Sequence, residues 1–242
     1  MELRGRVALV TGAGRRLGRE LAVALGGRGM RVAVHHNASA EGAAETARLI
    51  EAAGGEARTF SADLGTPDAP ERLVRVVAEA FGSIDVLVNS AAVMQRTPVG
   101  EVTAAQWDAM FALNLRAPFF LAQAAAPHMR GGGAIVNVAD LAAFETWPAY
   151  VPHGITKAGV VQMTRALARV LAPSVRVNAV APGAVLLPDD WDERSAGRLA
   201  ETTPLGRLGS PADVVGAVLY LLEADYVTGE CLVVDGGRHI RK

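Results

Sequence analysis

Short apolar runs rich in β-branched residues alternate with longer amphipathic stretches along the whole chain, and this alternation restricts the fold more than any other feature. Continuous apolar strands are typical of parallel sheets that helices cover on both faces. The runs predict strands at Val7–Val10, Val32–Val34, Ala57–Phe60, Val86–Val88, Ala134–Val138, Val175–Val180 and Leu232–Val234. The stretches between them predict helices, among them Ala40–Ala53, Pro67–Phe81, Thr103–Met129, Pro152–Leu171 and Pro211–Leu222. We therefore expect an α/β chain with one doubly wound parallel sheet of about seven strands and helices on both faces.

Nothing in the sequence divides its 242 residues into two domains. No linker, repeat or low-complexity segment interrupts the alternation, and a single α/β domain reaches about 250 residues. We expect one domain over residues 1–242, with a cofactor half at about 1–130 and a catalytic and substrate-loop half at about 131–242. The longest stretch without a predicted element, Gly183–Gly209, is typical of a lid over a site.

Charge and cysteine content exclude several classes of protein. With 24 Lys and Arg against 25 Asp and Glu, the net charge is −1, which argues against the broad basic surface that nucleic-acid binding requires. The single cysteine, Cys231, forms no internal disulfide and no thiolate-rich metal site, and we expect no metal. No run reaches the roughly 18 apolar residues that a membrane span needs. We expect a soluble, cytoplasmic protein that acts on a small molecule.

A glycine-rich turn follows the first predicted strand and precedes a helix that begins near Leu17. Its glycines are Gly12, Gly14 and Gly18, a spacing one residue longer than the G-x-G-x-x-G pattern of Rossmann-type folds. Glycines let the backbone approach a pyrophosphate, and the free amides at a helix N-terminus favour its negative charge. The turn therefore predicts a Rossmann-type sheet with a dinucleotide site at its first strand.

The segment after the second predicted strand distinguishes between the two pyridine dinucleotides. An acidic residue there holds the ribose hydroxyls of NAD and repels a 2′-phosphate. Here the segment carries His36, Asn37 and Ser39 and no acid, while Arg15 and Arg16 in the glycine-rich turn supply cations for the additional phosphate. NADP(H) is therefore favoured over NAD(H).

Three polar residues point to the chemistry. His153 and Lys157 open the helix after Pro152, and their spacing of four puts both on one helix face. Lys157 is one of only two lysines, and the other is the last residue. Asp140 follows a predicted strand at its carboxyl end, where open α/β sheets bind their ligands. We predict that these three side chains share a catalytic site.

On these motifs the chain resembles the short-chain dehydrogenase/reductase family over essentially its whole length. The matching segments are Thr11–Gly18, Asp63-Leu64, Asn89–Ala92, Asn114, Lys157, Pro182-Gly183 and an ending that runs from Tyr226–Gly229 to Asp235–Gly237. Within the family the chain is most similar to the pteridine reductases. These carry an arginine as at Arg16, a His-x-x-Ser segment as at His36 and Ser39, and an aspartate as at Asp140 in place of the usual catalytic serine.

The resemblance implies hydride transfer between NADPH and a carbonyl or imine substrate. In the family a tyrosine exchanges a proton, a lysine four residues later supports it and holds the nicotinamide ribose, and an asparagine relays protons. Carried over by position, the lysine is Lys157 and the asparagine is Asn114, while Asp63 would contact the adenine and Asn89 would hold the cofactor through backbone contacts. The implied cofactor-binding residues are Gly12, Gly14, Arg15, Arg16, Leu17, Gly18, His36, Asn37, Ser39, Asp63, Leu64, Asn89, Ser90, Ala91, Lys157, Pro182 and Gly183.

The family's tyrosine does not carry over, because the residue four positions before Lys157 is His153. Three proton sources stay open. The first is the imidazole of His153, a common general acid or base. The second is the phenol of Tyr150, and the third is Asp140 or water. The alternative function is an NADP(H)-binding sensor or scaffold that has lost turnover.

The substrate side differs from that of the pteridine reductases. Where they carry a serine and a phenylalanine, this chain has Ala92 and Met94, and a thioether lacks the flat ring that would stack on a pterin. The candidate substrate contacts are Met94, Trp147, Tyr150, Leu186 and Trp191. In the family the helices that correspond to Thr103–Met129 and Pro152–Leu171 pack between subunits, so the resemblance implies a homotetramer or homodimer.

Overall fold

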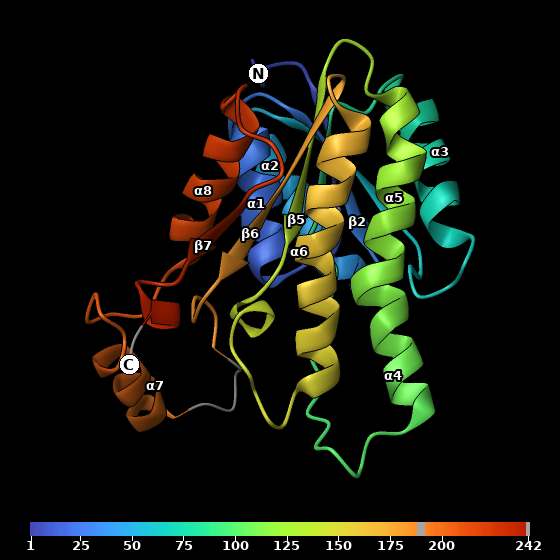
Figure 1. Cartoon of the computed structure of the whole chain (residues 1–242). Coiled ribbons are helices and arrows are strands. Elements are labelled where there is room, and N and C mark those ends of the chain that lie inside the picture. The colour runs from blue at the N-terminus through green and yellow to red at the C-terminus, as the bar shows by residue number, and fades with distance from the viewer. Residues whose placement is uncertain (188–191, 241–242) are drawn as a thin grey trace.

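All seven predicted strands form and pair in parallel. The computed structural model describes residues 1–187 and 192–240, and within them the strands lie in the order β3-β2-β1-β4-β5-β6-β7 (Figure 1). Their bounds are β1 Val7–Val10, β2 Arg31–His36, β3 Glu56–Ser61, β4 Val86–Asn89, β5 Gly133–Val138, β6 Val175–Pro182 and β7 Cys231–Val234. The predicted doubly wound sheet is confirmed.

Helices cover both faces of the sheet. They have the bounds α1 Arg16–Gly27, α2 Ala40–Ala52, α3 Ala69–Phe81, α5 Ala117–Ala125, α6 Val151–Leu171 and α8 Pro211–Glu223. Val7 and Leu9 of β1 pack with α3, α5 and α6, whereas the alternate residues Ala8 and Val10 pack with α1, α2 and α8. The two core layers explain why the strands read as continuous apolar runs.

The predicted helix Thr103–Met129 is a composite. It begins with α4 (Ala104–Phe111), whose capping box joins Thr103 and Gln106, and passes through a π-helical turn at Ala112–Arg116. It then continues as α5 and ends in a short 3-10 helix at Ala126–His128. A π-turn holds one more residue than an α-turn and is frequent at functional sites. Here it carries the buried Asn114.

The prediction that Gly183–Gly209 contains no regular element was wrong, because α7 forms at Glu193–Glu201. Asp192 caps this helix, its carboxylate accepting a hydrogen bond from the Ser195 amide at 2.7 Å. Its apolar face consists only of Ala196, Leu199 and Ala200, which are half-buried, and this short amphipathic pattern among charged residues was not recognised as a helix. No helix in the described part of the chain is both long and apolar enough to cross a bilayer.

The strand order reverses between β1 and β4, because β1 is followed in sequence by β2 on one side and pairs with β4 on the other. Open α/β sheets bind ligands in the crevice that such a reversal leaves outside the carboxyl ends of the strands. That end of the sheet lies at the bottom of Figure 1, where α6 begins and α7 lies.

Candidate functional site

A cavity of about 790 Å³ opens at the carboxyl ends of the strands, at this reversal. The glycine-rich turn lies at one end of its lining, and His153 and Asp140 belong to the same lining. Most residues predicted from the sequence line it: Gly12, Gly14, Arg15, Arg16, Leu17, Gly18, His36, Asn37, Ser39, Asp63, Leu64, Ser90, Ala91, Met94, Asp140, His153, Lys157, Pro182, Gly183 and Leu186. The structure thus brings segments between Gly12 and Leu186 together around one cavity.

The glycines of the turn are required by close backbone packing. Gly12 has a φ of +66°, and a Cβ on Gly18 would lie 2.3 Å from the Gly12 carbonyl oxygen. A Cβ on Gly14 would crowd Ser39, the residue before α2. The turn therefore closes directly onto the N-terminus of α1, whose free amides face an anion-binding position.

His35 holds this turn, a role that the sequence analysis missed. The Gly12 amide donates to His35 Nδ1 at 3.1 Å, so Nε2 carries the ring proton and donates to the Ala62 carbonyl at 3.1 Å. Burial lowers the pKa of His35 to about 4 and so keeps the ring neutral. The ring thereby joins the glycine-rich turn to the ends of β2 and β3. Its position at the buried end of a strand, directly before the exposed polar segment, is the signal that could have identified it.

Arg16 links the turn to the segment after β6. It has a φ of +51°, the left-handed region that favours glycine, and its guanidinium donates to the carbonyls of Leu186 at 2.8 Å and Leu187 at 3.2 Å. Family members with glycine at this place have no such side chain. Arg15 and Asn37 are exposed on the same rim of the cavity.

His153, Asp140 and Lys157 line one part of the cavity, and only 2% of His153 is exposed. Its Nδ1 lies 3.3 Å from the Val93 carbonyl oxygen, and its Nε2 lies 3.7 Å from Asp140 Oδ2. Within the described residues Nε2 is buried without a hydrogen-bond partner. Asp140 is held by its other oxygen, which accepts from the Ala142 amide at 2.9 Å. An orphaned buried nitrogen that lines a cavity is typical of a ligand-binding group.

Lys157 lies one helical turn after His153 on α6. Its ammonium donates to the Val138 carbonyl at the end of β5, at 2.8 Å. Burial lowers the pKa of Lys157 to about 8, and the nearby Asp140 carboxylate opposes this shift. The internal lysine therefore lies on the cavity.

The two predicted asparagines, Asn89 and Asn114, are buried and are not among the residues that line the cavity. The side chain of Asn114 accepts from the Val93 amide and donates to the Val93 carbonyl, both at 2.8 Å. Asn89 donates to Asn137 on β5 at 2.9 Å, and Asn137 donates to Thr164 on α6 at 2.9 Å. The two hydrogen bonds of Asn137 thus connect β4 and β5 to α6, the helix that carries His153.

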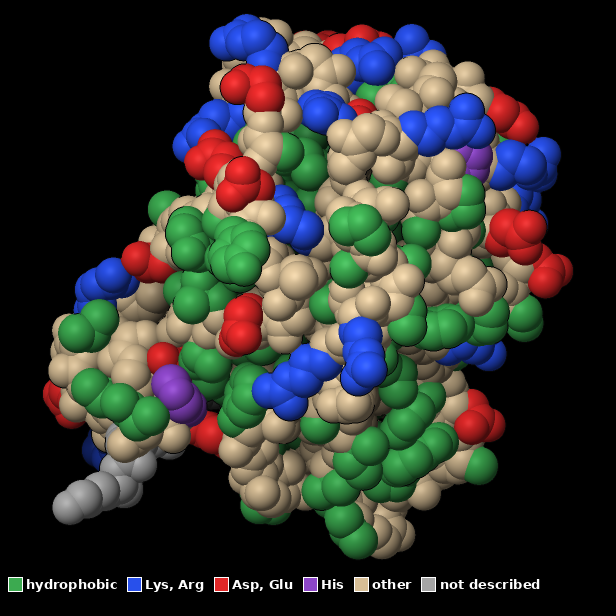
Figure 2. Space-filling view, turned by 45° about the horizontal axis from the view of Figure 1, so that its top comes forward, with side chains coloured by type: hydrophobic (Ala, Val, Ile, Leu, Met, Phe, Trp, Pro, Cys, Tyr) green, Lys and Arg blue, Asp and Glu red, His purple; other side chains and the backbone are tan. Residues whose placement is uncertain are grey.

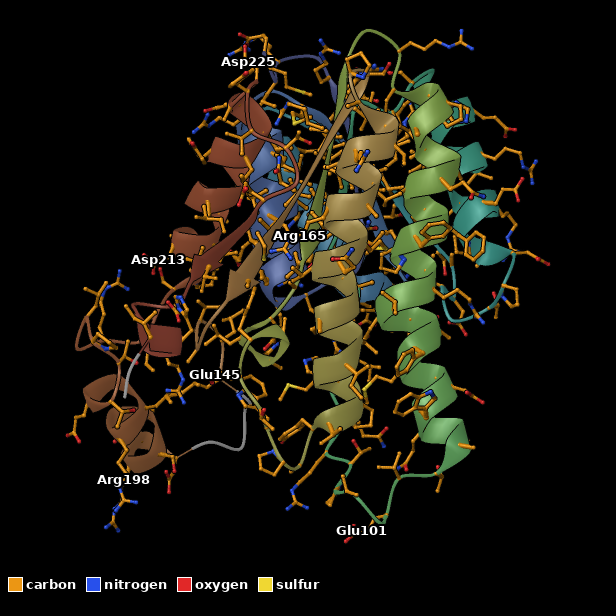
Figure 3. The ribbon with its side chains drawn as sticks, in the orientation of Figure 1. Glu101, Glu145, Arg165, Arg198, Asp213 and Asp225 are labelled. Atoms are coloured by element: carbon orange, nitrogen blue, oxygen red, sulfur yellow. The ribbon has the colours of Figure 1, made fainter. Side chains whose placement is uncertain are left out.

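Only two of the five candidate substrate contacts lie on the described lining of the cavity. Met94 and Leu186 line the cavity, whereas Trp147 and Tyr150 are not among its lining residues. Their rings pack edge to face with centroids 6.3 Å apart, and Trp147 Nε1 donates to Glu145, whose position on the loop before α6 is labelled in Figure 3. Trp191 lies outside the described residues. Apolar lining residues that were not predicted from the sequence include Val93, Leu113, Val138 and Val185.

The donors around this cavity suit a phosphorylated dinucleotide. A helix N-terminus with a glycine-rich turn faces one end, and the exposed Arg15 adds positive charge there. No acidic side chain follows β2, whose last residue His36 leads into Asn37. At the other end an imidazole, a carboxylate and an amine provide groups for proton exchange.

Comparisons with known proteins cover nearly the whole chain. The family model described as enoyl-(acyl carrier protein) reductase matches residues 12–239. The 3-oxoacyl-(acyl-carrier-protein) reductase of Synechocystis sp. is 35% identical over 241 residues, 97% of each chain. The structure of the angucycline C-6 ketoreductase LanV with bound NADP is 35% identical, with a TM-score of 0.92 over 99% of this chain and 97% of that chain. The FolM alternative dihydrofolate reductase 1 from Brucella canis complexed with NADP is 31% identical, with a TM-score of 0.93 over 100% and 96%.

Proposed function

Because the chain belongs to the short-chain dehydrogenase/reductase family, we propose that it is an NADP(H)-dependent reductase of a carbonyl or imine. One observation carries this proposal: the glycine-rich turn and His153, whose buried Nε2 has no hydrogen-bond partner among the described residues, line the same cavity. NADPH supplies, when bound, a hydride to the substrate carbon. The chain supplies the binding groups, the orientation and the proton.

The cofactor end would hold NADPH by its phosphates. The amides of the turn and the N-terminus of α1 would receive the pyrophosphate, and Arg15, His36, Asn37 and Ser39 the 2′-phosphate. The absence of an acid after β2 and the NADP bound in two structural neighbours support NADP(H) over NAD(H). Of the remaining cofactor-binding candidates, Asp63 would contact the adenine, and Leu64, Ser90, Ala91, Pro182 and Gly183 line the same cavity.

His153 would exchange the proton through Nε2. The Val93 carbonyl can only accept, so Nδ1 keeps its hydrogen in both protonation states of the ring. In the reducing direction the imidazolium gives its Nε2 proton to the substrate oxygen or nitrogen and becomes neutral. Asp140 would lie beside the imidazolium, since its Oδ2 is 3.7 Å from Nε2. The ammonium of Lys157, held by the Val138 carbonyl, would bind the nicotinamide ribose.

The decisive experiment follows NADPH oxidation by absorbance with a panel of ketones, quinones, imines and pterins. The pterins are included because of the similarity to FolM. Turnover by the wild type, its loss in His153→Gln and retained NADPH affinity in that variant would support the proposal. Tyr150→Phe and Asp140→Asn separate the other two proton sources, and near-full turnover by His153→Gln would contradict the mechanism. Tight NADPH binding without reduction of any compound in the panel would instead identify a sensor or scaffold.

We further propose that subunits meet along α4, α5 and α6, in a homotetramer or homodimer. An apolar groove of about 720 Å³ lies there, and Phe119 and Phe120 in its lining are 39% and 40% exposed. Hydrophobic side chains gather in the lower part of the face in Figure 2. Asp108 and Arg116 line the same groove and offer opposite charges to a second copy. Light scattering of Phe119→Glu should report a smaller particle than the wild type, and an unchanged mass would reject this interface.

A further inference from the structure

We infer that Asn114 and the Val93 carbonyl are positioning groups that select one tautomer of His153, so that Nε2 is the only ring nitrogen that exchanges protons with a ligand. The inference rests on the proposed role of His153 in catalysis, but it concerns the state of the ring itself. The measurement that tests it therefore does not require turnover.

One side-chain amide holds both backbone groups of Val93. Asn114 Oδ1 accepts from the Val93 amide, and Asn114 Nδ2 donates to the Val93 carbonyl, each at 2.8 Å. Val93 lies in the segment after β4, which has no helix or strand of its own, so these two bonds determine its orientation. Asn114 is itself fixed, because it is buried in the π-helical turn between α4 and α5.

The Val93 carbonyl in turn determines which nitrogen of His153 carries hydrogen. A carbonyl oxygen has two lone pairs and can accept from both Asn114 Nδ2 and His153 Nδ1, the latter at 3.3 Å. The neutral ring is then protonated on Nδ1 and bare on Nε2. Nε2 is buried and has no hydrogen-bond partner among the described residues, which leaves it available for a ligand.

The opposite tautomer, with hydrogen on Nε2, could not accept a proton from a ligand. With hydrogen on Nε2, the Nδ1 lone pair would face the Val93 oxygen, and the Nε2 proton would be attracted to the Asp140 carboxylate at 3.7 Å. Both nitrogens would then be unsuitable for accepting a proton from an alcohol. Without the Val93 carbonyl, the carboxylate would favour this inactive tautomer.

Thr156 connects Asn114 to the backbone of His153 by hydrogen bonds. It lies on α6 three residues after His153, and its hydroxyl donates to the His153 carbonyl at 2.7 Å. The same hydroxyl accepts from Asn114 Nδ2 at 3.2 Å. Asn114 therefore contacts the backbone on both sides of the imidazole, through Val93 on the loop and through Thr156 on the helix.

The test is a long-range ¹H–¹⁵N NMR correlation of the full chain labelled with ¹⁵N-histidine, without substrate. It distinguishes a bare ring nitrogen from a protonated one, and loss of the signal in His153→Gln assigns it. We expect Nδ1–H and bare Nε2 in the wild type. In Asn114→Leu we expect a mixture of tautomers or the reverse one, with NADPH affinity within about twofold and kcat reduced roughly 10- to 100-fold.

Thr156→Val is the matched control, because it removes one neighbour of Asn114 and leaves both bonds to Val93. It should keep the wild-type tautomer, and a shift as large as that of Asn114→Leu would overturn the role of Val93. An Nε2–H ring in the wild type would overturn the inference even if Asn114→Leu does not fold. If the NMR spectrum shows hydrogen on Nε2 and the protein still turns over substrate, this inference is refuted and the proposed function is not. If the spectrum shows hydrogen on Nδ1 and the protein is inactive with every substrate, the proposed function is refuted and this inference is not.

Discussion

Acidification should destabilise this protein through His35. The ring is neutral in the fold, where burial lowers its pKa to about 4, against 6.5 for an unperturbed histidine. Between these values the unfolded chain binds a proton that the folded chain does not, so the free energy of unfolding decreases as pH falls. The separation of the two pKa values, at about 1.4 kcal/mol per pH unit, corresponds to about 3 kcal/mol. This contribution is fully present above pH 6.5 and is lost by about pH 4.

Urea unfolding of the ligand-free protein at pH 7 and pH 4.5 measures this loss. His35→Asn is the informative variant, because its amide oxygen can accept a hydrogen bond but does not titrate. The decrease in unfolding free energy between the two pH values should be about 2 to 3 kcal/mol smaller in His35→Asn than in the wild type. His128→Asn, at a half-buried position in the 3-10 helix after α5, is the control and should behave as the wild type. Equal pH dependence in His35→Asn and the wild type would refute the reasoning.

Three further outcomes are expected. Gly18→Ala should reduce NADPH affinity in a fluorescence titration at least tenfold, because its Cβ would lie 2.3 Å from the Gly12 oxygen; unchanged affinity would contradict the turn geometry. NADPH affinity should decrease as pH rises through about 8, where the Lys157 ammonium with its lowered pKa loses its charge, and Lys157→Met should lack this decrease in the same titration. Thr164→Val should lower the free energy of unfolding in urea by about 1–3 kcal/mol, because the buried Asn137 amide loses its acceptor; a neutral result would show that Asn137 finds another.

The parts of the fold that follow from apolar burial could be predicted from the sequence. The strands and most helices bury continuous or periodic apolar residues, and such patterns specify the element and its face. Helix α7 has no fully buried residue and was missed, and the π-turn at Ala112–Arg116 was read as part of one helix. The apolar face of α7 is short and only half-buried, and the π-turn differs from an α-helix by a hydrogen-bond shift that the apolar pattern does not record.

The candidate site could be predicted where sequence position alone determines a residue's place. Residues that follow strands at their carboxyl ends converge by topology, as Asp140 and the glycine-rich turn do. Two of the bonds that organise the site could not be predicted as pairs, because one partner in each is a backbone group, which every residue carries. The Gly12 amide on His35 and the Val93 carbonyl at His153 are of this kind.

The π-turn between α4 and α5 has a consequence for protein engineering. Each residue in an α-helix advances the direction of the side chains by about 100°, so one additional residue rotates all that follows by that amount relative to what precedes. Deleting a single residue within Ala112–Arg116 would restore a regular helix and turn either Asn114 or the Phe119–Phe120 face away from its present neighbours. Sequence swaps between relatives in this segment should therefore preserve its length before they preserve its composition.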